Sequence, residues 1–229
     1  MSLRPADLPG TRVRRKPDRA SYHFAAVAAV FDTAPLVHVA TVRDGCPVVL
    51  PMVHGRLADQ LVLHGSPAAG LFRDFRRGSP VCVTATLYDG VVLARSARRH
   101  SVNYRSAVAY GVPSPVTDPD ALRAALRALV DHIVPGRWAA VREPDDEEVR
   151  DIQVWRVPLD HASVKVRAAG PNDLDSDRDL PVWAGHLPAR LEYGTPVPAA
   201  DLPRGLDAPA VRPDPGLWFD SPECPACPA

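Results

Sequence analysis

Two Asp-Gly pairs, Asp44-Gly45 and Asp89-Gly90, each stand between stretches rich in β-branched and apolar residues. This dipeptide favours the two-residue turn whose twist matches that of paired strands, so each pair predicts a β-hairpin. The first hairpin would join 36–42 to 47–54, and the second would join 80–87 to 91–94. A chain that forms two hairpins needs an antiparallel sheet, and no other feature restricts its fold as strongly.

Further β-rich runs cover 61–64, 104–110, 152–157 and 162–166, and the last two are predicted to form a strand pair. At least six β segments with few helices indicate a mainly β fold, an antiparallel barrel or sandwich, rather than a parallel α/β sheet.

Apolar residues at helical spacing predict a helix from Ser21 to near Pro35 and another that starts at Pro119. Asp118 is the expected N-cap of the second helix.

The segment 61–67 joins a strand to a helix predicted over 67–77. Ser66 is the expected N-cap, and Gly65 lets a ligand approach the backbone. Free N–H groups at a helix start favour an anion such as phosphate, and His64 would stand beside it. The motif is neither a Walker loop nor a Gly-x-Gly-x-x-Gly fingerprint, so a helix start that binds nothing is the alternative.

Composition narrows the class of protein. With 229 residues, 46% of them hydrophobic, the chain can bury one sizeable core. Its 27 basic and 27 acidic residues cancel, which argues against nucleic acid and anionic membranes as partners. No apolar run is long enough to span a bilayer and the N-terminal stretch lacks a secretory signal, so we expect a cytoplasmic protein.

Four regions are expected. Residues 1–19 form a basic arm, 20–170 the barrel, 171–207 an extension packed on the barrel, and 208–229 a proline-rich tail. The extension should lack regular structure but contact the barrel through its large apolar side chains, which are Trp183, Leu187, Leu191 and Tyr193. Cys224 and Cys227 in the tail have redox or half-zinc-site spacing, although a lone pair of this kind is more typical of an inert tail.

Several motifs, in their order and spacing, resemble the flavin-nucleotide-binding split-barrel superfamily of pyridoxamine 5′-phosphate oxidases, especially its nitroimidazole-reductase-like branch. They are Leu61-Val62-Leu63-His64-Gly65-Ser66-Pro67, Asp89-Gly90-Val91-Val92-Leu93-Ala94-Arg95-Ser96, His100-Ser101-Val102-Asn103-Tyr104-Arg105-Ser106, Ala162-Ser163-Val164-Lys165-Val166-Arg167 and Val182-Trp183-Ala184-Gly185. The likeness covers about residues 15 to 205.

The resemblance implies a six-stranded split β-barrel that forms a homodimer and holds FMN in the groove between subunits. Arginine forks and hydroxyl groups suit the phosphate, and the backbone of one strand would run beside the flavin ring. His64 matches a position near the flavin and is the catalytic candidate; the equal alternative is a structural histidine hydrogen-bonded to a backbone carbonyl. The predicted cofactor-binding residues are Pro51, Met52, Val53, His64, Gly65, Ser66, Arg95, Ser96, Ser101, Asn103, Tyr104, Arg105 and Lys165. For Lys165 the alternative, an ordinary strand lysine whose head reaches solvent, is slightly favoured.

The leading hypothesis is an FMN-dependent, nitroreductase-like oxidoreductase that takes electrons from NAD(P)H or another donor and reduces a small flat acceptor. The C-terminal Arg and His set of true pyridoxamine phosphate oxidases is missing, which argues against vitamin B6 oxidation. One alternative is a haem-binding or haem-handling split barrel, with His38, His54, His64 or His100 as axial ligand. Another is a flavin-binding module without turnover, and a deazaflavin could replace FMN.

Overall fold

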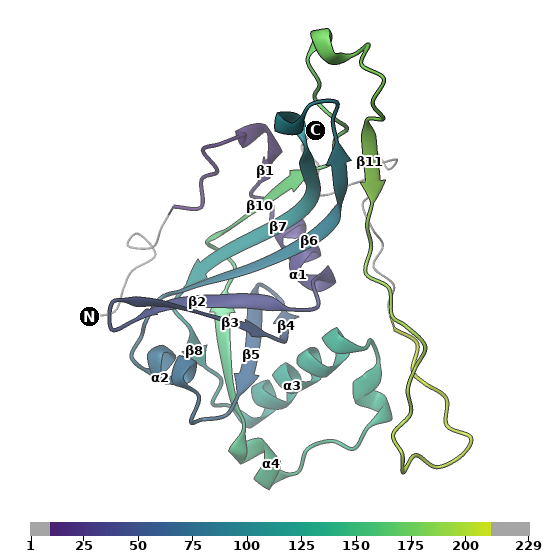
Figure 1. The fold of residues 1–229 in the computed structure, drawn as a ribbon. Helices are drawn as coiled ribbons and strands as arrows, with labels where there is room; N and C mark the ends of the chain where they lie inside the picture. Colours follow the sequence, from purple (N-terminus) through teal and green to yellow (C-terminus); the bar gives the residue numbers. More distant parts are fainter. Residues whose placement is uncertain (1–9, 212–229) are drawn as a thin grey trace.

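Two antiparallel sheets form the folded body, and the structure, a computed structural model, describes residues 10–211. Sheet A has the strand order β1-β10-β7-β6-β2-β3, with β11 paired to β6, and sheet B has the order β4-β5-β9-β8. The strands are β1 (Ala20–Ser21), β2 (Val37–Arg43), β3 (Cys46–Met52), β4 (His54–Leu57), β5 (Gln60–Gly65), β6 (Val81–Leu93), β7 (Ser101–Gly111), β8 (Ser114–Pro115), β9 (Gln153–Pro158), β10 (Ala162–Arg167) and β11 (Gly185–Pro188). The helices are α1 (Phe24–Thr33), α2 (Gly70–Arg76), α3 (Pro119–Ile133) and α4 (Asp146–Asp151), with short 3-10 turns η2 (Pro17–Arg19), η3 (Ala97–Arg99), η4 (Arg137–Ala140) and η5 (Asp175–Asp177). The mainly β, split-barrel prediction is confirmed (Figure 1).

The first predicted hairpin is confirmed. Strands β2 and β3 pair in register from Val37 opposite Met52 to Arg43 opposite Cys46. The turn between them places Asp44 at φ 51° and Gly45 at φ 80°, as a two-residue turn with left-handed residues requires.

The second predicted hairpin is wrong. Strand β6 continues through Asp89-Gly90 as one 13-residue strand and pairs with β7 on both sides of a bulge between Tyr88 and Gly90. Gly90 has φ 144°, and a Cβ there would overlap the carbonyl oxygen of Leu187 on β11. Gly90 is therefore required by a bulge and a close strand contact rather than by a turn.

The predicted pairing of the last two long strands is also wrong. β9 pairs with β5 and β8 in sheet B, whereas β10 pairs with β7 and β1 in sheet A. The connection between them is held by backbone hydrogen bonds to both sides, since Leu159 donates to Asp59 and Tyr110 donates to His161. These two consecutive strands therefore link the sheets instead of forming a hairpin.

The helix predictions hold with shifted boundaries. Helix α1 starts at Phe24, because Ser21 belongs to β1. Helix α2 starts at Gly70, and its N-cap residue, Ala69, supplies no side-chain cap. Ser66 is therefore not the N-cap of this helix, and its hydroxyl only accepts a hydrogen bond from Ala68 N at 3.3 Å.

The start of helix α3 agrees with the prediction. Asp118 caps the helix by accepting a hydrogen bond from Ala121 N at 2.8 Å.

Two apolar clusters stabilise the body. The larger lies among the two sheets, α1 and α2, and the smaller lies between sheet B and α3. Gly55 on β4 permits the second contact, since a Cβ there would come within 2.8 Å of the Ala128 backbone.

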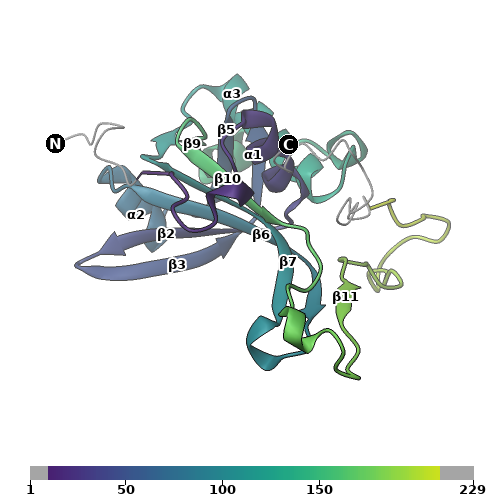
Figure 2. The same ribbon diagram turned by 90° about the horizontal axis from the view of Figure 1, so that it is seen from above.

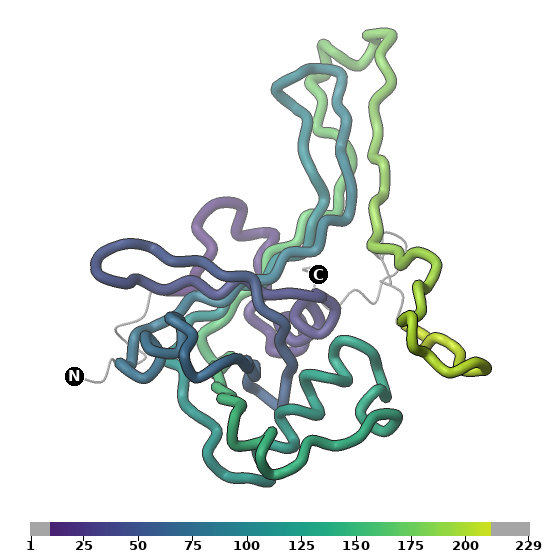
Figure 3. The backbone as a smooth tube through the Cα atoms, turned by 60° about the horizontal axis from the view of Figure 1, so that its bottom comes forward, coloured from purple at the N-terminus to yellow at the C-terminus, as the bar shows by residue number. Residues whose placement is uncertain are grey.

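The far ends of β6, β7 and β10 form, with β11, an arm that projects from the body (Figures 1 and 3). Seen from above, the β2–β3 hairpin and the arm extend in different directions (Figure 2). The extension attaches to the arm through β11, a strand that was not predicted. Its large apolar side chains are exposed in the single chain by 49–60%, namely Trp183, Leu187, Leu191 and Tyr193.

The expected region boundaries stay predictions, and Cys224 and Cys227 lie outside the described residues. Within residues 10–211, none of the helices has the length and apolar character needed to cross a bilayer.

Candidate functional site

Within one chain, most of the predicted cofactor residues fall into two groups. One group lies where β3 and β5 end and comprises Pro51, Met52, Val53, His64, Gly65 and Ser66. The other lies on the arm and comprises Arg95, Ser96, Ser101, Asn103, Tyr104 and Arg105. Figure 1 shows β5 in the body and the far ends of β6 and β7 in the projecting arm. One chain alone therefore does not bring the two groups together.

In the first group, His64 is the residue with accessible chemistry. His64 lies two residues after Val62 on β5, so the two side chains lie on the same face of the strand. Val62 packs in the cluster beside α3, and the His64 side chain therefore lies on that face of sheet B. The ring remains exposed, and partial burial lowers its pKa below the usual 6.5. The imidazole is accordingly neutral at pH 7 and keeps a nitrogen lone pair for a metal or a proton.

Gly65 and the end of strand β3 form the surroundings of His64. A Cβ at Gly65 would lie 3.0 Å from the Phe72 ring, so packing requires a glycine here, and its role in ligand approach stays a prediction. Strand β3 is the edge strand of sheet A, which leaves one side of the backbone leading to Met52 and Val53 without a strand partner. Such backbone groups suit the polar edge of a flavin ring.

On the arm, Arg105 forms a buried ion pair with Asp89. Its Nη2 donates to Asp89 Oδ1 at 2.6 Å, and its Nε lies 3.1–3.2 Å from both carboxylate oxygens. The two side chains are 6% and 0% exposed. Sequence reasoning missed this role of Asp89 because the residue was assigned to a turn.

Arg95 is likewise paired. Its backbone N–H and guanidinium donate to the two carboxylate oxygens of Asp173, at 2.9 Å and 2.6 Å. These hydrogen bonds, the backbone one foremost, lower the pKa of Asp173. Both arginines predicted to bind phosphate, Arg95 and Arg105, are therefore paired with carboxylates. The role of these two arginines in phosphate binding stays a prediction.

Asn103 and Lys165 also have specific partners. Asn103 is fully buried, and its Oδ1 accepts hydrogen bonds from the Arg167 guanidinium and from Ala169 N. Its Nδ2 has no acceptor among the described residues. Lys165 Nζ donates to the backbone carbonyl of Arg15 at 2.9 Å, so this lysine joins the N-terminal arm to β10.

The four histidines considered as haem ligands have different environments. His54 is fully buried, its Nε2 donates to the Phe31 carbonyl at 2.8 Å, and burial lowers its pKa to about 4. His38 and His64 are exposed on their strands. His100 is exposed beside η3, and its Nδ1 donates to the Ser96 carbonyl at 3.1 Å. This hydrogen bond does not use Nε2, the other ring nitrogen.

An outer face of sheet A, the side away from the core, carries no charged residue across β3, β2, β6 and β7. By register it consists of Pro47, Val49, Pro51, Val42, Ala40, His38, Cys82, Thr84, Thr86, Tyr88, Tyr110, Val108, Ser106 and Tyr104. Val42, Val49 and Tyr88 are 62%, 56% and 50% exposed. An uncharged sheet face of this extent is typical of an interface.

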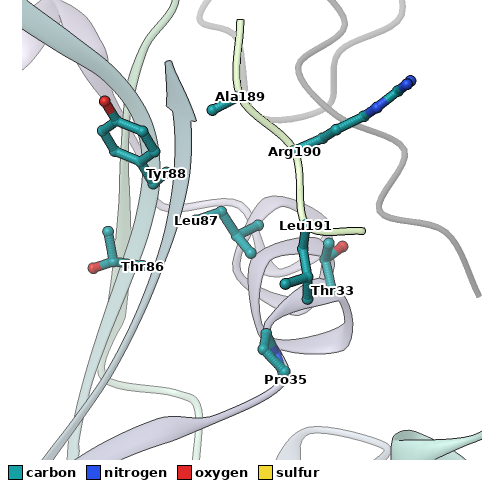
Figure 4. A pocket seen from close by; sticks show the side chains of 8 residues that line it. All are labelled: Thr33, Pro35, Thr86, Leu87, Tyr88, Ala189, Arg190 and Leu191. Atoms are coloured by element: carbon teal, nitrogen blue, oxygen red, sulfur yellow. The ribbon is translucent and has the colours of Figure 1, made fainter. Parts of the chain in front are cut away.

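A hollow of about 290 Å³ lies between the end of α1, the middle of β6 and the segment after β11. Figure 4 shows Leu87 and Leu191 lining it, whereas Arg190 extends away. No sequence signal marked this hollow, because its walls come from three distant segments.

Comparisons with known proteins agree with this architecture. A family model described as pyridoxamine 5′-phosphate oxidase matches residues 25–166. The structure of an FAD- and haem-binding protein from Mycobacterium smegmatis is 37% identical, covers 83% of this chain and 94% of its own, and has a TM-score of 0.79. The flavocytochrome Anf3 from Azotobacter vinelandii is 33% identical, with coverage of 87% and 92% and a TM-score of 0.80.

A more distant structure supports the predicted branch. It is provisionally described as a 5-nitroimidazole antibiotic resistance protein from Bacteroides thetaiotaomicron, is 26% identical, covers 64% of this chain and 86% of its own, and has a TM-score of 0.56. No curated protein matches the chain.

Proposed function

The chain belongs to the pyridoxamine 5′-phosphate oxidase family, and from this premise we propose that it is a redox protein that binds FAD together with haem. Two relatives at 37% and 33% identity support the proposal, since one is described as binding FAD and haem and the other as a flavocytochrome. They favour the haem-binding alternative over the nitroreductase-like reading, and FAD over FMN.

The observation that carries the proposal is the orientation of His100. A histidine that ligates a metal through one nitrogen usually donates its other N–H to a carbonyl, which fixes the ring and its tautomer. His100 has this arrangement, because Nδ1 donates to Ser96 O while Nε2 is left for a ligand. Arg98 and Arg99 precede it in η3 and suit the carboxylates of a haem.

The other histidines fit less well. His54 has no accessible nitrogen, since its ring is fully buried and Nε2 is bound to Phe31 O. His38 projects from the uncharged outer face, where Ala40 and Thr84 are its neighbours and no hydrogen-bond partner fixes its ring in the described contacts. It is the second candidate for the axial ligand, and His64 is the third.

A homodimer is part of this proposal. We infer that a second copy covers the outer face, because it is uncharged, exposed and not covered by any helix of the described chain. A two-fold contact there would allow residues near β3 and β5 of one subunit to approach the arm of the other. The two separate groups of predicted cofactor residues would then contribute to one site.

The protein residues supply position and electrostatics to the cofactors. A flavin, if bound, would supply two-electron and one-electron redox chemistry, and a haem would supply one-electron chemistry. His64, neutral at pH 7, can hold or release a proton beside the flavin. The uncharged outer face would exclude bulk water between the subunits once a second copy covers it.

Visible absorption spectroscopy of the purified protein tests the proposal. We expect a flavin spectrum together with a Soret band after haem titration, and FAD rather than FMN on release of the flavin. His100→Ala should remove the Soret band, whereas His64→Ala and the exposed control His23→Ala should retain it. A protein that retains neither cofactor would refute the function, and loss of the Soret band only in His38→Ala would move the ligand to the outer face.

A further inference from the structure

Arg167, at the end of β10, is a buried cation that has no carboxylate partner among residues 10–211. Arg167 as a whole is only 6% exposed. Its guanidinium donates to neutral acceptors, which are Asn103 Oδ1, Ala169 O at 2.9 Å and Gly170 O at 3.0 Å. Among the described residues no Asp or Glu pairs with it, in contrast to Arg95 and Arg105.

The surroundings of Arg167 add positive charge. Burial is the main cause of its lowered pKa, and repulsion from Arg19 is the second. Arg19 ends η2, the 3-10 turn that packs on β10, and Lys165 lies two residues before Arg167. The only acidic residue in this turn is Asp18, which is exposed. A buried charge that lacks a counter-charge is costly, and neighbouring cations increase the cost.

Hydroxyl groups complete the cluster. Tyr104 and Ser106 on β7 lie opposite Arg167 and Lys165 in the strand register. Asn103 is fully buried beside them with its Nδ2 unpaired. Lys165 Nζ donates to the Arg15 carbonyl and Ser106 Oγ to the Lys165 carbonyl, so these donors have neutral partners and no acidic one. Guanidinium, ammonium, amide and hydroxyl groups on neighbouring strand positions are the donor types that bind a phosphate.

We propose that Arg19, Lys165 and Arg167, where the N-terminal arm crosses β10, bind the phosphate group of a nucleotide-type ligand. Of this cluster only Lys165 is among the residues predicted from the sequence to bind the cofactor. The predicted arginines differ from Arg167, because Asp89 and Asp173 neutralise Arg105 and Arg95 whereas no described carboxylate neutralises Arg167. The carrier of the phosphate is either the diphosphate of bound FAD or a separate ligand such as a dinucleotide. The inference rests on the proposed function only for that first carrier.

Calorimetric titration with inorganic pyrophosphate tests the site on the protein as purified and after saturation with FAD. Arg19→Gln and Lys165→Gln each remove one charged donor from a partly exposed position, so folding should be retained. Each should raise the Kd for the phosphate ligand about tenfold, the effect of one charge-assisted hydrogen bond. Arg150→Gln on α4 removes an exposed arginine elsewhere and should leave the Kd unchanged.

The two carriers give different results. If FAD supplies the phosphate, saturated protein no longer binds pyrophosphate, and Arg19→Gln weakens FAD but not riboflavin. If a separate ligand supplies it, saturated protein still binds pyrophosphate, and Arg19→Gln weakens that binding. Unchanged affinity of both Arg19→Gln and Lys165→Gln for pyrophosphate and FAD would overturn the inference. Failure of the proposed function would appear separately, as missing flavin and Soret bands.

Discussion

Lowering the pH should destabilise the protein through His54, which is buried in its neutral form. The ring packs 4.2 Å from the ring of His132, centroid to centroid, and its Nε2 donates to Phe31 O. Burial is the main cause of its pKa of about 4 in the folded protein, and His132 is the second. In the unfolded chain the pKa returns to about 6.5, so between these values the unfolded state binds more protons.

The sign and size of the effect follow from this difference. Stability from a neutral His54 is fully present above pH 6.5 and is lost as the pH falls toward 4. A difference of about 2.5 pKa units, at about 1.4 kcal/mol each, lowers the free energy of unfolding by about 3 kcal/mol.

Urea unfolding at fixed protein concentration, from pH 7.5 to pH 4, measures this loss. His54→Gln keeps a donor for Phe31 O but does not titrate, so its stability should fall by about 3 kcal/mol less than that of the wild type over this range. Parallel pH profiles of the two proteins would refute the reasoning, because the titrating group would then be another residue.

Two further substitutions test the contact of β4 with α3 and the buried Asp89–Arg105 ion pair. Gly55→Ala should destabilise the protein by about 1–3 kcal/mol in urea unfolding, because a Cβ there meets the α3 backbone, whereas Gly170→Ala, with open space around it, should have little effect. Asp89→Asn should lower the free energy of unfolding by about 3–5 kcal/mol, because it leaves the Arg105 charge buried without its carboxylate. Adding Arg105→Met to the same chain should restore stability if charge, and not shape, is the cause. A loss below about 1 kcal/mol in Asp89→Asn would contradict the prediction.

The sequence predicted the elements whose signals are local. The Asp44-Gly45 turn and the Asp118 cap each depend on residues within a few positions, and both form as predicted. Asp89-Gly90 carries the same two letters but forms a bulge, because β11 pairs with β6 there and Arg105 binds the Asp89 carboxylate. Those partners are distant in sequence, so a local pattern cannot reveal them.

The candidate site has the same limit. An arginine in a polar motif looks available for phosphate, but Arg95 meets Asp173 only after the extension returns to the arm. Arg167 gave no signal beyond its motif, since only the structure shows that no carboxylate among the described residues pairs with it. Charge that stays unbalanced after folding is therefore the feature that structure adds to sequence.

Pro47 and Pro51 lie in β3, the edge strand of sheet A, and restrict how another strand could add to this sheet. A proline has no N–H to offer, so a further strand cannot add along this edge with a full set of hydrogen bonds. A continuous sheet that extends from one molecule to the next is thereby disfavoured, although the adjoining outer face of sheet A is uncharged and exposed. If two copies pair through the outer face as proposed, that face is used up in both molecules, and assembly would stop at the dimer.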